Sequence, residues 1–225
     1  MPDSPASDLT HPAHISFRTR FTGVFALTFD DGPNPRVTPA ILLRLRELGL
    51  KATFFVVGER ITRFPEGLAM ALADGHALGS HFYHHLDWRG ATVAQLHAEL
   101  DLCQHTVDDV LGYHYPLRQV RPPYGHISDN LITVLRERQE NLVLWQAGCD
   151  EKNVPDLSVD ALCGMLRDHP ELAGWEGILL MHDIHPQTVN LLAALVRLAL
   201  ERNLLPATTR QLLDAITAAG PASAR

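Results

Sequence analysis

Cysteine, long apolar runs and clustered positive charge are all scarce in this chain of 225 residues. The three cysteines, Cys103, Cys149 and Cys163, show no Cys-x-x-Cys spacing, so we expect reduced, mostly buried thiols. No apolar stretch resembles a signal peptide or could span a bilayer, so we expect a cytoplasmic chain, or an exported one if a leader was removed. A net charge of −7 without a basic block argues against nucleic acid as a partner.

What the chain has in quantity is apolar residues, at 46%, and histidine, at 13 residues. The apolar share is enough for one sizeable core. We expect a flexible arm at residues 1–14, a single catalytic domain at 15–220 and a frayed tail at 221–225, in a monomer. Histidine is the commonest metal ligand and the usual proton carrier near neutral pH, which directs attention to a metal site.

Apolar strand-like runs alternate with segments of helical spacing. The expected strands are residues 24–29, 52–57, 77–80, 119–121, 142–147, 178–182 and 205–207. Helices are expected at 38–49, at 93–111 with a Thr92–Gln95 capping box, at 187–202 and after Thr208. About seven β–α repeats predict an α/β fold, either a distorted, incomplete (β/α) barrel or an open sheet, with function at the carboxyl ends of the strands.

Two adjacent carboxylates, Asp30 and Asp31, end the first expected strand and precede a Gly-Pro turn. Burying neighbouring carboxylates is costly unless a cation or proton compensates. A metal that takes one carboxylate and leaves the other for proton transfer would explain the pair.

His81 and His85, four residues apart after the third strand, can bind one ion from a shared helical face. Together with Asp31 they form an open set of two imidazoles and one carboxylate. His84 offers an alternative partner for His81 three residues away.

Two further segments carry chemistry. The stiff run from Arg121 to Gly125 can hold Arg121 against a carboxylate and offer the Tyr124 amide to an oxyanion. His182 ends a buried strand and would be the general acid beside a metal site, with Asp183 and His185 as supports.

Four motifs occur in order: TFDDGP at residues 28–33, H-x-x-x-H at 81–85, RPPY at 121–124 and LMH at 180–182. In this combination the chain closely resembles the polysaccharide deacetylase family (carbohydrate esterase family 4) over residues 22–217. The resemblance implies a distorted (β/α) barrel that uses a divalent metal to hydrolyse acetyl groups on sugars.

Carried over by residue, the resemblance implies that Asp31, His81 and His85 bind the metal, most often Zn²⁺, with Co²⁺ or Ni²⁺ as alternatives. It further implies the following roles: Asp30 as general base, His182 as general acid, Arg121 as the residue orienting Asp30, the Tyr124 amide as an oxyanion donor, and Leu180 as a wall of the acetyl pocket.

The chain departs from the family pattern at two places. Phe82 replaces the usual Ser or Thr, so a hydrogen bond near the metal is expected to be missing. In place of D-x-x-D-W, residues 150–154 read Asp-Glu-Lys-Asn-Val, and Asp150 is expected to support His182.

The sequence thus predicts a metal-dependent deacetylase of N-acetylglucosamine-containing glycans or oligosaccharides. A lipid-linked-sugar deformylase or a small-molecule amidohydrolase is the enzymatic alternative. A catalytically silent glycan- or metal-binding module is the alternative from another class, although such a module has no use for both a base and an acid.

Overall fold

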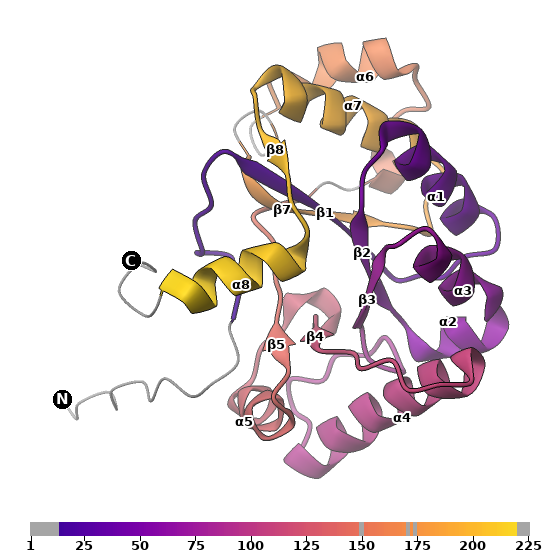
Figure 1. Ribbon diagram of the computed structural model, residues 1–225, viewed down its shortest axis with the longest axis vertical. Coiled ribbons are helices and arrows are strands. Elements are labelled where there is room, and N and C mark those ends of the chain that lie inside the picture. The colour runs from indigo at the N-terminus through magenta and orange to yellow at the C-terminus, as the bar shows by residue number, and fades with distance from the viewer. Residues whose placement is uncertain (1–13, 149–150, 170–171, 173–174, 220–225) are drawn as a thin grey trace.

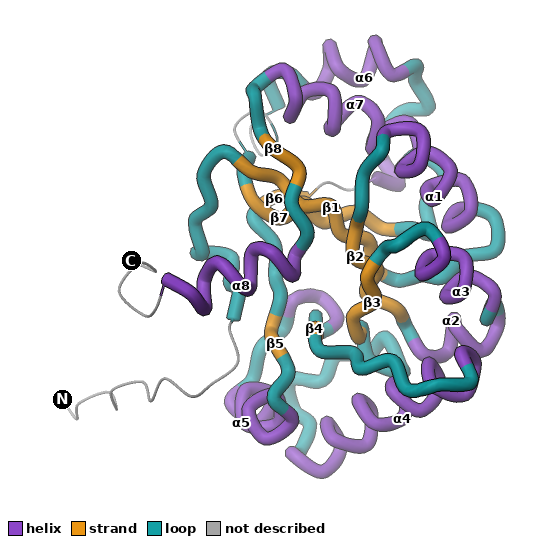
Figure 2. The backbone as a smooth tube through the Cα atoms, in the orientation of Figure 1, coloured by secondary structure: helices purple, strands orange, loops and turns teal. Residues whose placement is uncertain are grey.

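The computed structural model describes residues 14–148, 151–169, 172 and 175–219. The strands are β1 (Val24–Asp30), β2 (Ala52–Val56), β3 (Ala77–Ser80), β4 (Gln119–Val120), β5 (Asn141–Leu142), β6 (Ala147–Gly148), β7 (Gly177–His182) and β8 (Leu205–Pro206). The helices are α1 (Val37–Leu48), α2 (Gly58–Arg63), α3 (Glu66–Ala73), α4 (Val93–Leu111), α5 (Asp129–Arg138), α6 (Val159–Leu166), α7 (Thr188–Glu201) and α8 (Thr209–Ala219). Helices surround the curled strands in Figure 1, and long loops connect them in Figure 2.

The strands are all parallel and follow the order β5-β4-β3-β2-β1-β7-β6, with β8 paired to β1. The two ends of this order, β5 and β6, lie only four residues apart in the chain, so one segment joins both edges of the sheet. This closure confirms the predicted distorted, incomplete (β/α) barrel.

The expected single strand at residues 142–147 is wrong, because the segment changes partners in its middle. Its first part pairs with β4 and its last part with β7. Between them, Val143 forms an isolated parallel bridge with Ile15, and the Leu144 amide donates to the Ile15 carbonyl at 2.8 Å. The apolar run in the sequence therefore gave no indication that the segment changes its pairing strand.

Alternation along β1 divides the core into two layers. Phe25, Leu27 and Phe29 pack outward against the helices. Ala26 belongs to an inner cluster with Phe55, Ile178 and two leucines of α8. Thr28 and Asp30 share the parity of Ala26, so the same strand that builds the core also carries a carboxylate into the interior of the barrel.

The predicted helix ends are confirmed where capping chemistry defined them. Thr92 and Gln95 form the reciprocal capping box of α4, and Gly112 ends that helix in a left-handed conformation. Thr208 and Gln211 form the same pair of contacts before α8.

Three other expectations concern thiols, chain ends and membranes. Cys103 and Cys163 are buried free thiols, whereas Cys149 lies outside the described residues. Of the expected arm only His14 is described, and the tail 221–225 is not. Among the residues that the structure describes, no helix is long and apolar enough to cross a membrane.

Candidate active site

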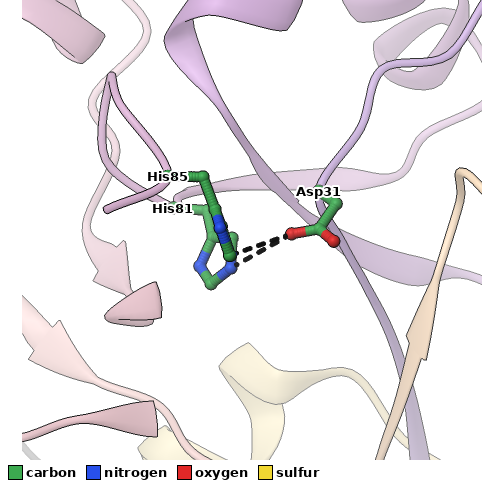
Figure 3. A group of neighbouring side chains, drawn as sticks. All are labelled: Asp31, His81 and His85. Carbon is green, nitrogen blue, oxygen red and sulfur yellow. Dashed lines mark ion pairs between the residues drawn. The ribbon is translucent and has the colours of Figure 1, made fainter. Parts of the chain in front are cut away.

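Asp31, His81 and His85 converge at the carboxyl ends of β1 and β3 (Figure 3). One ligand atom from each lies within 4.8 Å of the others. The Asp31 Oδ1 atom is 3.5 Å from Nε2 of His81 and 3.2 Å from Nε2 of His85. That oxygen is buried without a hydrogen-bond partner among the described residues, which is the state expected of an atom reserved for a cation.

The protonation of these groups also fits a divalent metal. The His81 Nδ1 atom lies 2.7 Å from the Arg121 carbonyl, which can only accept, so Nδ1 donates there and Nε2 is the nitrogen that faces Asp31. Burial lowers the pKa of His85 and favours the neutral, ligating ring. Burial would raise the pKa of Asp31, but His81, His85 and His182 hold that pKa well below its usual range.

The segment carrying the two histidines is a loop, so the expectation of a shared helical face is wrong. Phe82 has a φ of 67° and turns its side chain into an apolar cluster with Trp88. A side chain of α4 holds this loop in place. The carboxylate of Glu99 lies 2.7 Å from Nδ1 of His84 and accepts a hydrogen bond from the His84 backbone amide. His84 therefore faces Glu99, and the geometry favours His85 as the partner of His81.

Asp30 lies deeper than Asp31, and its side chain is 3% exposed. Its Oδ1 accepts from Nη1 of Arg121 at 2.7 Å, and the same nitrogen donates to the Thr28 hydroxyl at 2.8 Å. The remaining guanidinium nitrogens donate to the carbonyls of Val143 and Leu144. Arg121 is completely buried, so it occupies the barrel interior and holds Asp30 in one orientation.

On the other side of Asp31, His182 is held by Glu151, a residue that the sequence did not single out. The Glu151 Oε2 atom lies 2.9 Å from Nδ1 of His182, and Oε1 accepts from the His182 amide at 2.7 Å. Asp150, the expected support, lies outside the described residues. The sequence could have indicated Glu151 as a candidate partner of His182, because it is a carboxylate next to Asp150 with a side chain one methylene longer.

The environment of His182 favours its charged form. Burial opposes the charge, but the hydrogen bond and charge of Glu151, together with Asp30 and Asp31, raise the pKa of His182 to about 9. His182 is therefore protonated near neutral pH and has an Nε2–H to donate. Asp30 and His182 are register partners on β1 and β7, which places the two groups side by side at the end of the barrel.

A cleft of ≈ 650 Å³ opens beside these residues. Its lining includes Asp31, His182, Leu180, Trp145 and Phe17. Phe17 is 46% exposed and meets Trp145 edge-on, with ring centroids 4.8 Å apart. The cleft thus offers apolar walls next to the charged groups, a combination typical of small-molecule sites.

Tyr124 lies at another part of the site, in a single 3₁₀ turn with a φ of 60°. Tyr124 is 58% exposed, and its ring lies 4.7 Å from that of His85, centroid to centroid. The predicted site residues that the structure describes therefore gather in one place, and Asp150 lies outside the described residues.

Comparison with known proteins places the chain in a family. The sequence model of the family described as polysaccharide deacetylase matches residues 19–141. The peptidoglycan-N-acetylmuramic acid deacetylase of Bacillus subtilis is 33% identical over 72% of this chain and 32% of its own length. A peptidoglycan-N-acetylglucosamine deacetylase of Bacillus cereus is 30% identical over 78% of this chain and 79% of its own.

Among solved structures, a peptidoglycan deacetylase from Bacillus subtilis superposes with a TM-score of 0.70 at 28% identity. The match covers 89% of this chain and 93% of that one. The chain belongs to the polysaccharide deacetylase family. It spans about a third of the full length of the first Bacillus subtilis relative, 32%.

Proposed function

We propose that this protein is a metal-dependent deacetylase that removes the acetyl group from N-acetylglucosamine units of a glycan or oligosaccharide. The observation that carries the proposal is the pairing of a buried carboxylate, Asp30, and a charged histidine, His182, at adjacent strand ends next to a candidate metal-ligand set. A binding module would have no use for both a base and an acid at adjacent strand ends.

The metal proposed for Asp31, His81 and His85 is Zn²⁺, with Co²⁺ or Ni²⁺ as alternatives, since two imidazoles and one carboxylate leave open positions on such ions. When bound, the ion would polarise the acetyl carbonyl and lower the pKa of water at the site. His81 is oriented for this role by the Arg121 carbonyl.

The proton transfers are assigned to Asp30 and His182. Asp30, held by Arg121, accepts a proton from the attacking water, which adds to the acetyl carbon. His182, held by Glu151, donates its Nε2 proton to the amide nitrogen as the C–N bond breaks, releasing acetate and a free amine. Without that donation the amine would have to leave as an anion, so both groups are required.

The remaining predicted residues, Leu180 and Tyr124, are proposed to contact the acyl group, and two aromatic residues of the cleft are proposed to contact the sugar. Leu180 lines the cleft and is proposed as the apolar wall of the acetyl pocket. The Tyr124 amide is proposed to donate to the oxyanion. Phe17 and Trp145 offer an aromatic wall for a sugar ring.

Three of the relatives support the substrate class, since two are named as deacetylases of peptidoglycan and one, from Azorhizobium caulinodans, as a deacetylase of chitooligosaccharide. The test is acetate release by metal-stripped protein, with and without Zn²⁺ or Co²⁺, from N-acetylglucosamine oligomers and from peptidoglycan glycan strands. Metal-restored acetate supports the proposal. Formate from N-formyl sugars without acetate would favour the deformylase, and metal binding without any product would favour the silent module.

A further inference from the structure

Asp183, the residue after His182, is buried at 1% exposure and has no part in the proton transfers above. Its backbone amide donates to the Asp30 carbonyl at 3.2 Å. Its Oδ2 atom accepts from the Thr38 hydroxyl at 2.5 Å. Asp183 therefore connects the end of β7 to the end of β1 and to the first turn of α1.

The carboxylate of Asp183 also lies against the turn that follows Asp31. A Cβ atom placed on Gly32 would lie 2.1 Å from both carboxylate oxygens, so only glycine fits there. At the far end of the turn, the Asn34 amide donates to the Thr38 hydroxyl at 2.7 Å. One carboxylate, acting directly and through Thr38, thus contacts both the start and the end of the turn.

The stability of the fold does not explain an acid at this place. The Oδ1 atom of Asp183 is buried without a hydrogen-bond partner among the residues that the structure describes, and burial raises the pKa of Asp183 to about 7. A buried acid with an unpaired oxygen is destabilising, so we look for the contribution of Asp183 in the turn that it contacts. Elsewhere in the core the paired hydroxyls of Thr53 and Thr209, 2.7 Å apart, are neutral.

The turn needs external support because Asp31 has a φ of 73°, in the left-handed region that is unfavourable for a non-glycine residue. That conformation brings its Oδ1 to 3.2 Å from Nε2 of His85. We propose that Asp183, through Gly32 and Thr38, is a positioning residue that holds Asp31 in its metal-ligating conformation.

The inference rests on the proposed metal site but not on the substrate, so its test measures metal affinity. The metal-stripped protein, residues 1–225, is titrated with Zn²⁺ by calorimetry, and its melting temperature without metal is recorded. Asp183→Ala and Thr38→Val remove the support, and we expect each to weaken Zn²⁺ binding on the order of 10-fold or more. Asp183→Asn and Thr38→Ser keep an acceptor and a hydroxyl, so we expect most of the affinity to remain.

Thr53→Val is the matched control, because it removes a buried threonine hydroxyl away from the turn. We expect it to lower the melting temperature with no change in Zn²⁺ affinity. Wild-type-like affinity in both Asp183→Ala and Thr38→Val would overturn the inference, and so would an Asp183→Asn loss as large as that of Asp183→Ala, which would mean that charge acts instead of position. Wild-type protein that binds no metal would instead overturn the proposed function, and this inference with it.

Discussion

The two proton-transfer groups of the site lie in contrasting surroundings. Asp30 is enclosed in the barrel interior, held by an arginine that is completely buried and bonded to two carbonyls of the closing segment. His182 is 27% exposed at the edge of the cleft and is held by Glu151, from a short 3₁₀ turn outside the barrel. The base therefore depends on the core of the fold, whereas the acid depends on a short turn between strands.

Replacing Asp30 should give the largest effect on activity. Asp30→Asn keeps the shape of the base but removes its basicity, and we expect kcat/KM to fall on the order of 10³-fold. The variant should still bind Zn²⁺, since Asp31 and the two histidines supply the ligands. Acetate release and calorimetry measure the two properties separately.

Two comparisons sharpen that experiment. His81→Ala should lose both Zn²⁺ affinity and activity, because it removes a ligand. Asp101→Asn changes a carboxylate paired with Arg138 on the surface and should alter neither. Acetate release by Asp30→Asn at the wild-type rate would contradict the assignment of the base.

The base and the acid also differ in how much of their surroundings could be predicted from the sequence. Asp30 and Arg121 lie in the part of the chain that the family model matches, and the strand-end positions together with the ordered motifs were enough to predict them. Their distances could not be predicted, because they depend on how the segment after β5 closes the barrel and brings its carbonyls to Arg121.

On the acid side, the sequence predicted His182 but not its partner. Glu151 was missed because the length and orientation of a side chain decide whether its carboxylate can contact a histidine. Residue spacing in a loop does not define that orientation. The same limit applies to His81 and His85, where a spacing of four suggested a helix and the structure has a loop fixed by Glu99. Residue types were predictable at these places, and the backbone path was not.

Removing the charge of Glu151 should have an intermediate effect that depends on pH. Glu151→Gln takes away the main source of the raised pKa of His182, so we expect that pKa to fall from about 9 toward its ordinary 6.5. At pH 6 the acid stays protonated and kcat changes little. At pH 8 only a few per cent would be protonated, so kcat should fall about 30-fold.

The raised pKa of His182 also makes the stability of the protein depend on pH. A folded-state pKa above the unfolded value means that the His182–Glu151 contact stabilises the protein fully below about pH 6.5 and loses this contribution as pH rises through 9. Glu140→Gln is the control, since Glu140 is a buried carboxylate paired with Arg138 at 3.0 Å. An unshifted alkaline limb of the rate profile in Glu151→Gln would contradict the role of Glu151.

The smallest expected effect concerns Phe17, which lies before the residues that the family model matches. Because an aromatic contact contributes roughly 0.5–1.5 kcal/mol, we expect Phe17→Ala to raise KM for an N-acetylglucosamine oligomer about 3- to 10-fold with little change in kcat. Phe17→Tyr should restore KM, and Tyr113→Ala, which removes an exposed aromatic ring outside the lining of the cleft, should leave it unchanged. A fall in kcat at constant KM would instead mean that Phe17 acts on the chemical step through Trp145. The contrast between the enclosed catalytic groups and the exposed wall of the cleft would then not hold.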